Sequence, residues 1–178
     1  MSLSHVLLTS LLEQPSTGFE LARRFDRSMG YFWNASHQQI YRELNQMLEK
    51  NWLSTIEDEH SSGRKKTYCV ESAGRQELAS WLLKSSKPTA IRDDLMVRLR
   101  AEAQLNSGKI YQELEQHLTA HKNTLALYQK IYAKDFEQLE QPNRVHFIHK
   151  KILQLGIQQE LCWIEWLQEM LVELPSFD

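Results

Sequence analysis

The sequence predicts a mainly α-helical fold with one small β-hairpin, and two stretches lead to this prediction. Residues 36–50 combine a helix cap with apolar residues at helical spacing, and two strand-like runs follow at 53–56 and 67–70, joined by a polar turn. From Lys109 onward, apolar residues recur at alternating three- and four-residue steps, as in a coiled-coil-like pair of helices. We therefore expect an N-terminal winged helix-turn-helix, followed by a long antiparallel helical pair that serves dimerisation.

The composition is that of a globular protein without a membrane segment. The 178 residues are 42% hydrophobic and 25% charged, and no apolar run is long enough to span a bilayer or is built like a signal peptide. Cys69 and Cys162 lie far apart and have no metal-ligand spacing, so we expect reduced thiols and a cytoplasmic location. Because the net charge is −2, affinity for DNA would have to come from a local basic patch.

Two helices are expected before the capped one. The first spans residues 3–14 and ends before Pro15, and its leucines cover most of its circumference, so we expect it to be buried on more than one side. Thr17 and Glu20 have the spacing of a capping box and start the second helix, which ends at Gly30.

The third helix carries the candidate base-reading residues. Ser36 is a good N-cap, and Gln39 completes a capping box with it. Apolar residues occupy one face of this helix, whereas side chains that can hydrogen-bond base edges gather on the other face near its start. A recognition helix needs this arrangement, because its N-terminal residues reach into the major groove. The expected DNA-contacting residues of this helix are Ser36, His37, Gln38, Gln39, Tyr41, Arg42 and Asn45.

The hairpin that follows has a basic tip. Residues 61–63 supply turn chemistry, and Arg64, Lys65 and Lys66 place three positive charges beside them, where we expect contacts with DNA phosphates. The acidic run at residues 57–59 is expected to pair with these cations across the hairpin.

A domain boundary is expected near the middle of the chain. Residues 71–84 are predicted to form a fourth helix in which Leu82 is buried. The composition then breaks at residues 85–89. We therefore predict a winged-helix DNA-binding domain at residues 1–86 and a helical dimerisation domain at residues 87–178.

The second domain is expected to contain a short helix around residues 91–99 and then two long helices over 109–139 and 144–173. The long helices carry more apolar surface than one hairpin can cover, so we expect two copies to pack together. The residues expected at the dimer interface are Leu7, Leu11, Leu118, Leu125, Ile152, Leu155, Trp163, Trp166 and Met170.

Three histidines of the second domain allow other roles. His121 lies at an apolar position of the helical seam, where it can set the register or form an inter-subunit hydrogen bond. His146 and His149 are one helical turn apart but lack further ligands, so a structural or solvent role is favoured over a metal site.

The aromatic residues of the long helices allow two interpretations. Trp163 and Trp166 are expected in the dimer core, and the alternative is a small-molecule pocket that they line together with Tyr128 and Tyr132. The sequence has no glycine-rich phosphate loop, nucleophile motif or carboxylate pair in a plausible pocket. We therefore predict no enzymatic activity, no cofactor and no metal.

Two segments resemble a known family. The segments IYRELNQMLEKNWL and GRKKTYCVESAGRQEL resemble the PadR-type transcriptional regulators, and YFWNASHQQIYRELNQM together with the helical tail resembles the virulence-activator branch of that family. The resemblance implies a dimer that binds a two-fold, palindromic DNA site and is held together by the tail and the first helix. It also implies that Tyr41 and Leu44 are the characteristic Tyr-x-x-Leu pair of the recognition helix.

The chain departs from the family pattern around the hairpin. Trp52 stands where the family usually has glycine, so Asn51 is expected to take the left-handed position instead. Glu71 replaces a common capping threonine, for which Ser72 is a possible substitute, and Lys65 replaces a frequent proline.

These observations predict a homodimeric, sequence-specific DNA-binding transcriptional regulator. Two alternatives remain at this point: a sensor of the same fold whose helical domain binds an aromatic ligand, and a winged-helix protein-interaction module that does not bind DNA.

Overall fold

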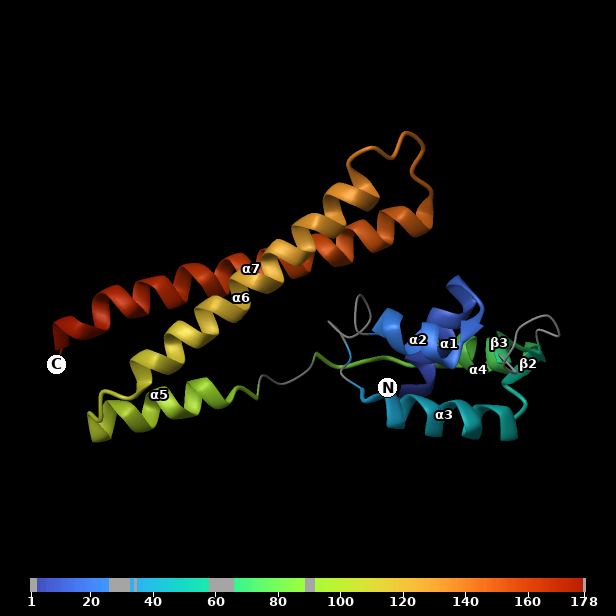
Figure 1. The fold of residues 1–178 in the computed structure, drawn as a ribbon, viewed down its shortest axis with the longest axis horizontal. Helices are drawn as coiled ribbons and strands as arrows, with labels where there is room; N and C mark the ends of the chain where they lie inside the picture. The colour runs from blue at the N-terminus through green and yellow to red at the C-terminus, as the bar shows by residue number, and fades with distance from the viewer. Residues whose placement is uncertain (1–2, 26–32, 34, 58–65, 89–91, 178) are drawn as a thin grey trace. The chain divides into compact units, whose positions relative to one another are not determined.

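The chain forms two compact units, Met1–Thr89 and Ala90–Asp178. The computed structural model describes residues 3–25, 33, 35–57, 66–88 and 92–177, and Figure 1 labels the elements. Each unit has a hydrophobic cluster of its own. None of the helices in the described ranges is both long enough and apolar enough to cross a lipid bilayer.

The first unit is a set of helices around a small sheet. Its strands form one antiparallel sheet in the order β1-β3-β2, and the predicted hairpin is confirmed as β2 and β3. The two-residue strand β1 was not predicted; it pairs Ser16 with Tyr68 and Thr17 with Thr67. The elements are α1 (Leu3–Glu13), β1 (Ser16–Thr17), α2 (Gly18–Phe25), α3 (His37–Glu49), β2 (Leu53–Glu57), β3 (Lys66–Val70) and α4 (Ser72–Leu82).

The start of α2 is capped as the sequence predicts. The hydroxyl of Thr17 accepts the amide hydrogen of Glu20 at 3.2 Å, and the Glu20 carboxylate accepts the amide of Thr17 at 2.9 Å. Arg24 on the same helix donates to the carbonyls of Ser10 and Gln14, each at 2.9 Å, at the end of α1. These bonds satisfy backbone groups that helix ends leave open, and they tie α1 to α2.

The core of the first unit lies between α1, α2, α3 and the sheet. Leu7 and Leu11 are 0% and 1% exposed within it. Their own subunit already covers these side chains, which leaves little of their surface for a partner, and their expected place at a dimer interface stays a prediction. The predicted burial of Leu82 is wrong, because this residue at the end of α4 is 70% exposed.

The link from α3 to β2 depends on Asn51. Its φ of 55° is in the left-handed region, as expected from the missing glycine. The amide of Trp52 donates to the carbonyl of Met47 at 2.9 Å, which closes the end of α3. At α4 the N-cap is Glu71, which makes no side-chain capping bond. Ser72 is the first helical residue, so the expected capping by Ser72 is wrong.

The second unit confirms the predicted helical pair. It contains α5 (Asp94–Leu105), α6 (Ile110–Phe136), α7 (Arg144–Glu173) and the short 3-10 helix η2 (Leu174–Phe177). In Figure 1 the chain reverses after α6 (yellow to orange), and α7 (orange to red) runs back along it. The hydrophobic cluster of this unit joins α5, the start of α6 and the later part of α7, and we call this part the base of the unit. Its fully or nearly buried side chains are Leu95, Ile110, Leu114 and Leu167.

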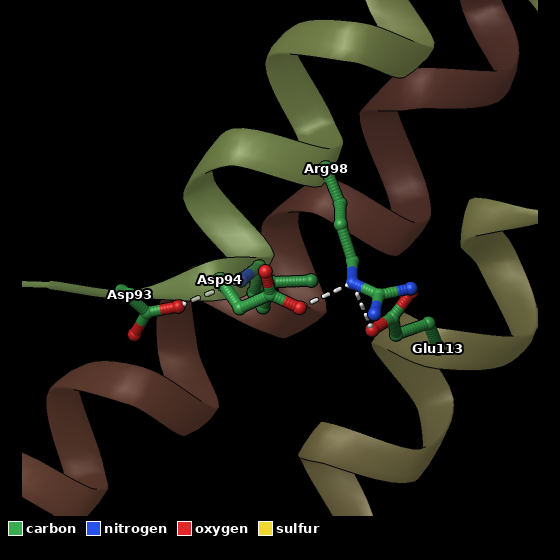
Figure 2. A network of polar contacts seen from close by, with 5 residues as sticks. Asp93, Asp94, Arg98 and Glu113 are labelled. Carbon is green, nitrogen blue, oxygen red and sulfur yellow. Dashed lines mark hydrogen bonds and ion pairs between the residues drawn. The ribbon is translucent and has the colours of Figure 1, made fainter.

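Polar contacts join α5 to α6, as Figure 2 shows. Asp93 caps α5 by accepting the amide of Leu95 at 2.9 Å. The Nε of Arg98 lies 2.5 Å from Asp94 and 3.3 Å from Glu113 on α6. The hydrogen bond with Asp94, and then the charges of Asp94 and Glu113, raise the pKa of Arg98 further above its ordinary value. Because these groups are exposed, the link adds little to stability.

Two contacts hold α6 against α7 further along the pair. His121 lies 2.6 Å from the carboxylate of Glu160, and its ring stacks on Trp163 with centroids 5.1 Å apart. The hydrogen bond of His121 is therefore made within the subunit, although the sequence also allowed a bond between subunits. Gly156 lies against the nearly buried ring of Tyr128, and a Cβ at residue 156 would lie 2.9 Å from Tyr128 Cε2.

The close approach at Gly156 gives a first prediction. Gly156→Ala should lower the free energy of unfolding by about 1 kcal/mol, because overpacking costs ~1–3 kcal/mol while alanine gains ~1 kcal/mol in helix propensity. In a Tyr128→Leu background, Gly156→Ala should instead raise the free energy of unfolding, because the ring that the added methyl group would meet is gone. Urea denaturation at one protein concentration measures both. The same sign in both backgrounds would show that the ring does not set the spacing.

Tyr68 gives a second prediction, on pH. Burial raises the pKa of Tyr68 above 10.0, and Tyr41 raises it further. The folded state thus favours the neutral phenol, so its stabilisation is complete below 10.0 and is lost as the pH rises through the higher folded pKa. The free energy of unfolding of Tyr68→Phe should therefore fall less steeply than that of the wild type above this pH. If the free energies of unfolding of the two proteins fall with pH at the same slope, burial of Tyr68 does not raise its pKa.

Candidate nucleic-acid interface

The candidate recognition helix α3 is fixed at its start by a complete capping box. The hydroxyl of Ser36 accepts the amide of Gln39 at 3.3 Å, and the side-chain oxygen of Gln39 accepts the amide of Ser36 at 2.8 Å. This prediction is confirmed. Both side chains are thus engaged in starting the helix, which limits what they can offer to another molecule.

One face of α3 is anchored in the core, and the other is open. Ile40, Leu44 and Met47 are fully buried. Gln38, Arg42 and Asn45 are exposed and lie four and three residues apart, which places them on one side of the helix. His37 is exposed at the first turn. The helix therefore presents amide and guanidinium groups on a rigid support.

Tyr41 lies at the border of this open face. It is 42% exposed, and its ring lies against Gly18 at the start of α2. Sequence reasoning missed Gly18. A glycine directly after the capping residue Thr17 was the available signal, since glycine at such a place can mark a close approach of another side chain.

The wing contributes Lys66 at the start of β3. Its Nζ lies 3.8 Å from the carboxylate of Glu57, the residue that it faces across the hairpin. This confirms the expected cross-strand pairing for Glu57. The pair is half-exposed and therefore weak, so Lys66 can exchange this partner for a phosphate. Arg64 and Lys65, the turn at residues 61–63 and the acids at 58 and 59 lie outside the described residues.

The expected interface residues of the second unit fall into two groups. Ile152 and Leu155 on α7 are 41% and 57% exposed. The others are at least partly covered by their own subunit, and four of them pack on the cluster at the base of the unit. These partly buried residues are Leu118, Leu125, Trp163, Trp166 and Met170.

The aromatic residues considered for a ligand pocket pack on other side chains. Tyr128 covers Gly156, Tyr132 is approached by Lys150, and Trp163 contacts both His121 and Trp166. These contacts do not support a pocket lined by the four rings.

The histidine near the start of α7 has a structural role. The side-chain oxygen of Asn143 accepts the amide of His146 at 2.9 Å, and the His146 ring returns to the amide of Asn143 at 3.4 Å. Across the part of the chain that the structure describes, no group of three or more His, Cys, Asp or Glu residues could hold a metal ion.

Two family models match the chain. Residues 7–80 match the transcriptional regulator PadR-like family, and residues 91–174 match the virulence activator alpha C-terminal family. A probable transcriptional regulator of Mycobacterium tuberculosis is 36% identical and covers 96% of this chain and 96% of its own. The negative transcriptional regulator PadR of Bacillus subtilis is 25% identical over 98% of each chain.

Solved structures share the fold over nearly the whole chain. The Vibrio cholerae virulence activator AphA has a TM-score of 0.82 and 29% identity, covering 99% of this chain and 100% of its own. Bacillus subtilis PadR in complex with operator DNA has a TM-score of 0.82 and 24% identity over 96% of each chain. The resemblance predicted from the sequence is thus confirmed: the chain belongs to the PadR-like family of transcriptional regulators, which are not enzymes.

Proposed function

We propose that this regulator binds specific double-stranded DNA as a homodimer, with α3 in the major groove and the wing on phosphates. The observation that carries the proposal is the exposed row Gln38, Arg42 and Asn45 on a helix whose other face is locked in the core. The fold shared with an operator-bound relative supports it. A cytoplasmic location follows from this role.

The chemistry of the exposed row fits base edges. Gln38 and Asn45 carry amides, which pair with adenine through two hydrogen bonds, and the guanidinium of Arg42 pairs in the same way with guanine. Ser36 and Gln39 act mainly by holding the first turn, from which His37 also faces the duplex. On the wing, Lys66 with Arg64 and Lys65 contacts phosphates. We also propose the division into a DNA-binding domain at 1–86 and a dimerisation domain at 87–178.

An apolar stripe on α7 supports dimerisation. Val145, Ile148, Ile152 and Leu155 recur at three- and four-residue steps, and all four are more than 40% exposed within one subunit. A stripe of this kind on a helix surface is removed from water when a second copy packs against it. We place Ile152 and Leu155 at the centre of the dimer contact, with Leu118, Leu125, Trp163, Trp166 and Met170 supporting it from behind.

The charges of α7 favour an antiparallel contact between two copies. Cations gather in its first part, at Arg144, Lys150 and Lys151, and carboxylates follow in its second part, at residues 160, 165, 169 and 173. If two such helices run in opposite directions about a two-fold axis, the basic part of each faces the acidic part of the other.

The DNA-binding roles predict different results for two substitutions. Lys66→Ala should weaken binding to every duplex and lower the salt slope by about one per subunit, because a phosphate contact is lost. Gln38→Ala should relax the preference at one base position and cost about 1–3 kcal/mol on the preferred site alone. Lys84→Ala, an exposed lysine of the first unit, is the matched control.

A salt-titrated selection from random duplexes, followed by affinity measurements on the enriched sites, tests both. Equal losses on all sequences from both substitutions would contradict the division between base and phosphate contacts. If the selection enriches no sequence at all, sequence-specific DNA binding is contradicted, and the protein-interaction module becomes the favoured alternative.

The dimer contact is tested by two charges on the stripe. The double variant Ile152→Asp and Leu155→Asp should be monomeric at micromolar concentration, because a dimer would bury both carboxylates without partners. Gln158→Asp with Gln168→Asp adds the same charge at two exposed positions of α7 and should stay dimeric. Analytical ultracentrifugation measures the oligomeric state of both variants. If the stripe variant is still dimeric, the stripe is not the dimer interface.

A further inference from the structure

The recognition helix meets α2 at a residue without a side chain. A Cβ on the buried Gly18 would lie 2.5 Å from Tyr41 Cε1, 3.1 Å from Cζ and 3.3 Å from Cδ1. The first distance is far below van der Waals contact, so the Tyr41 ring lies directly on the backbone of residue 18. Any other amino acid there would push the ring aside or move α3 away from α2.

The sheet ties the middle strand to the segment that leads into Gly18. Tyr68 on this strand is nearly buried and pairs with Ser16, two residues before Gly18. The start of α2, on which the Tyr41 ring lies, is therefore held by backbone pairing as well as by its own capping box.

The ring is held, but the residue is not covered. Tyr41 stays 42% exposed on the helix that carries Gln38 and Arg42. Its hydroxyl is a hydrogen-bond donor at the end of a stiff side chain with few torsions. Hydrogen bonds to phosphate oxygens fix the orientation and register of a protein on the duplex, whereas base contacts read the sequence.

We propose that the backbone at Gly18 forms a socket that holds Tyr41 so that its hydroxyl donates to a DNA backbone phosphate and sets the register of α3 in the major groove. This inference rests on the proposed DNA binding and adds to it a named contact and its support. Tyr41 is the contacting residue, and Gly18 is a positioning residue.

A neutral donor suits this place in the fold. The carboxylate of Glu20 occupies the start of α2, where it is bonded to the amide and hydroxyl of Thr17, both at 2.9 Å. A negative group there disfavours a phosphate at the helix terminus itself, so the phenol reaches the phosphate from the side. A hydroxyl carries no charge and releases no counterion, which distinguishes it from the wing lysine.

The contact is tested with Tyr41→Phe, which removes the hydroxyl and keeps the ring. We expect it to bind about tenfold more weakly per subunit on preferred and random duplexes alike, because one hydrogen bond to a charged group is lost. The slope of log affinity against log salt should stay as in the wild type. Tyr132→Phe makes the same chemical change in the second unit and should bind as the wild type does.

The socket is tested with a double-mutant cycle. Gly18→Ala should weaken binding at least as much as Tyr41→Phe does, because the ring is displaced. In a Tyr41→Ala background, Gly18→Ala should cost no further affinity. If Gly18→Ala lowers the affinity by the same factor with and without the Tyr41 side chain, the socket is overturned. Circular dichroism melts of each variant ensure that binding is compared between folded proteins; if Gly18→Ala does not fold, the Tyr41→Phe result still decides the contact.

The outcomes separate this inference from the function on which it rests. Wild-type protein that ignores duplex DNA at low salt would overturn both. Wild-type protein that binds DNA, with Tyr41→Phe binding equally well, would overturn the phosphate contact alone. A Tyr41→Phe loss confined to one base position would assign Tyr41 to base reading and would also overturn the inference.

Discussion

The anchoring of α3 is the constraint on which the candidate interface depends. Ile40, Leu44 and Met47 are fully buried, and the capping box of Ser36 with Gln39 fixes where the helix begins. Core packing fixes the rotation of a helix about its axis, and the cap fixes its start along the chain. The Cα–Cβ bond of every residue on the open face therefore has a defined direction before DNA arrives, so the helix backbone needs no ordering on binding and only rotamers of the exposed side chains remain to be fixed.

Local patterns in the sequence predicted most of this fold. The capping boxes that start α2 and α3 and the reversal between the long helices follow from neighbouring residues, whereas the left-handed Asn51 was expected from the family pattern. Family membership then confirmed the prediction of a transcriptional regulator and excluded an enzyme. The two-residue strand β1 could not be predicted, and the glycine after Thr17 could mark a close approach but not name Tyr41 as its partner, because each contact exists only through a distant segment. At Leu7 and Leu11 the predicted burial is observed, but a helix that is apolar all round does not say whether the same chain or a second copy covers it.

The two units meet different physical demands. In the first, apolar side chains turn inward and polar groups that suit nucleic acid remain outside. In the second, the helical pair keeps an apolar stripe open on α7, while His121 bonded to Glu160 and the close approach at Gly156 hold α7 to α6. The stripe is thus displayed by a supported helix, and a partner copy would meet a surface that is already shaped.

The place of β3 between β1 and β2 has a mechanical consequence. Lys66 begins this strand, and Tyr68, two residues on, is bonded to the segment just ahead of α2. A force applied at Lys66 is therefore carried by the backbone hydrogen bonds of β3 into the segment that leads into α2. The strands β2 and β3 cannot move as an arm independent of β1, so a contact made at Lys66 is mechanically linked to the helices of the first unit.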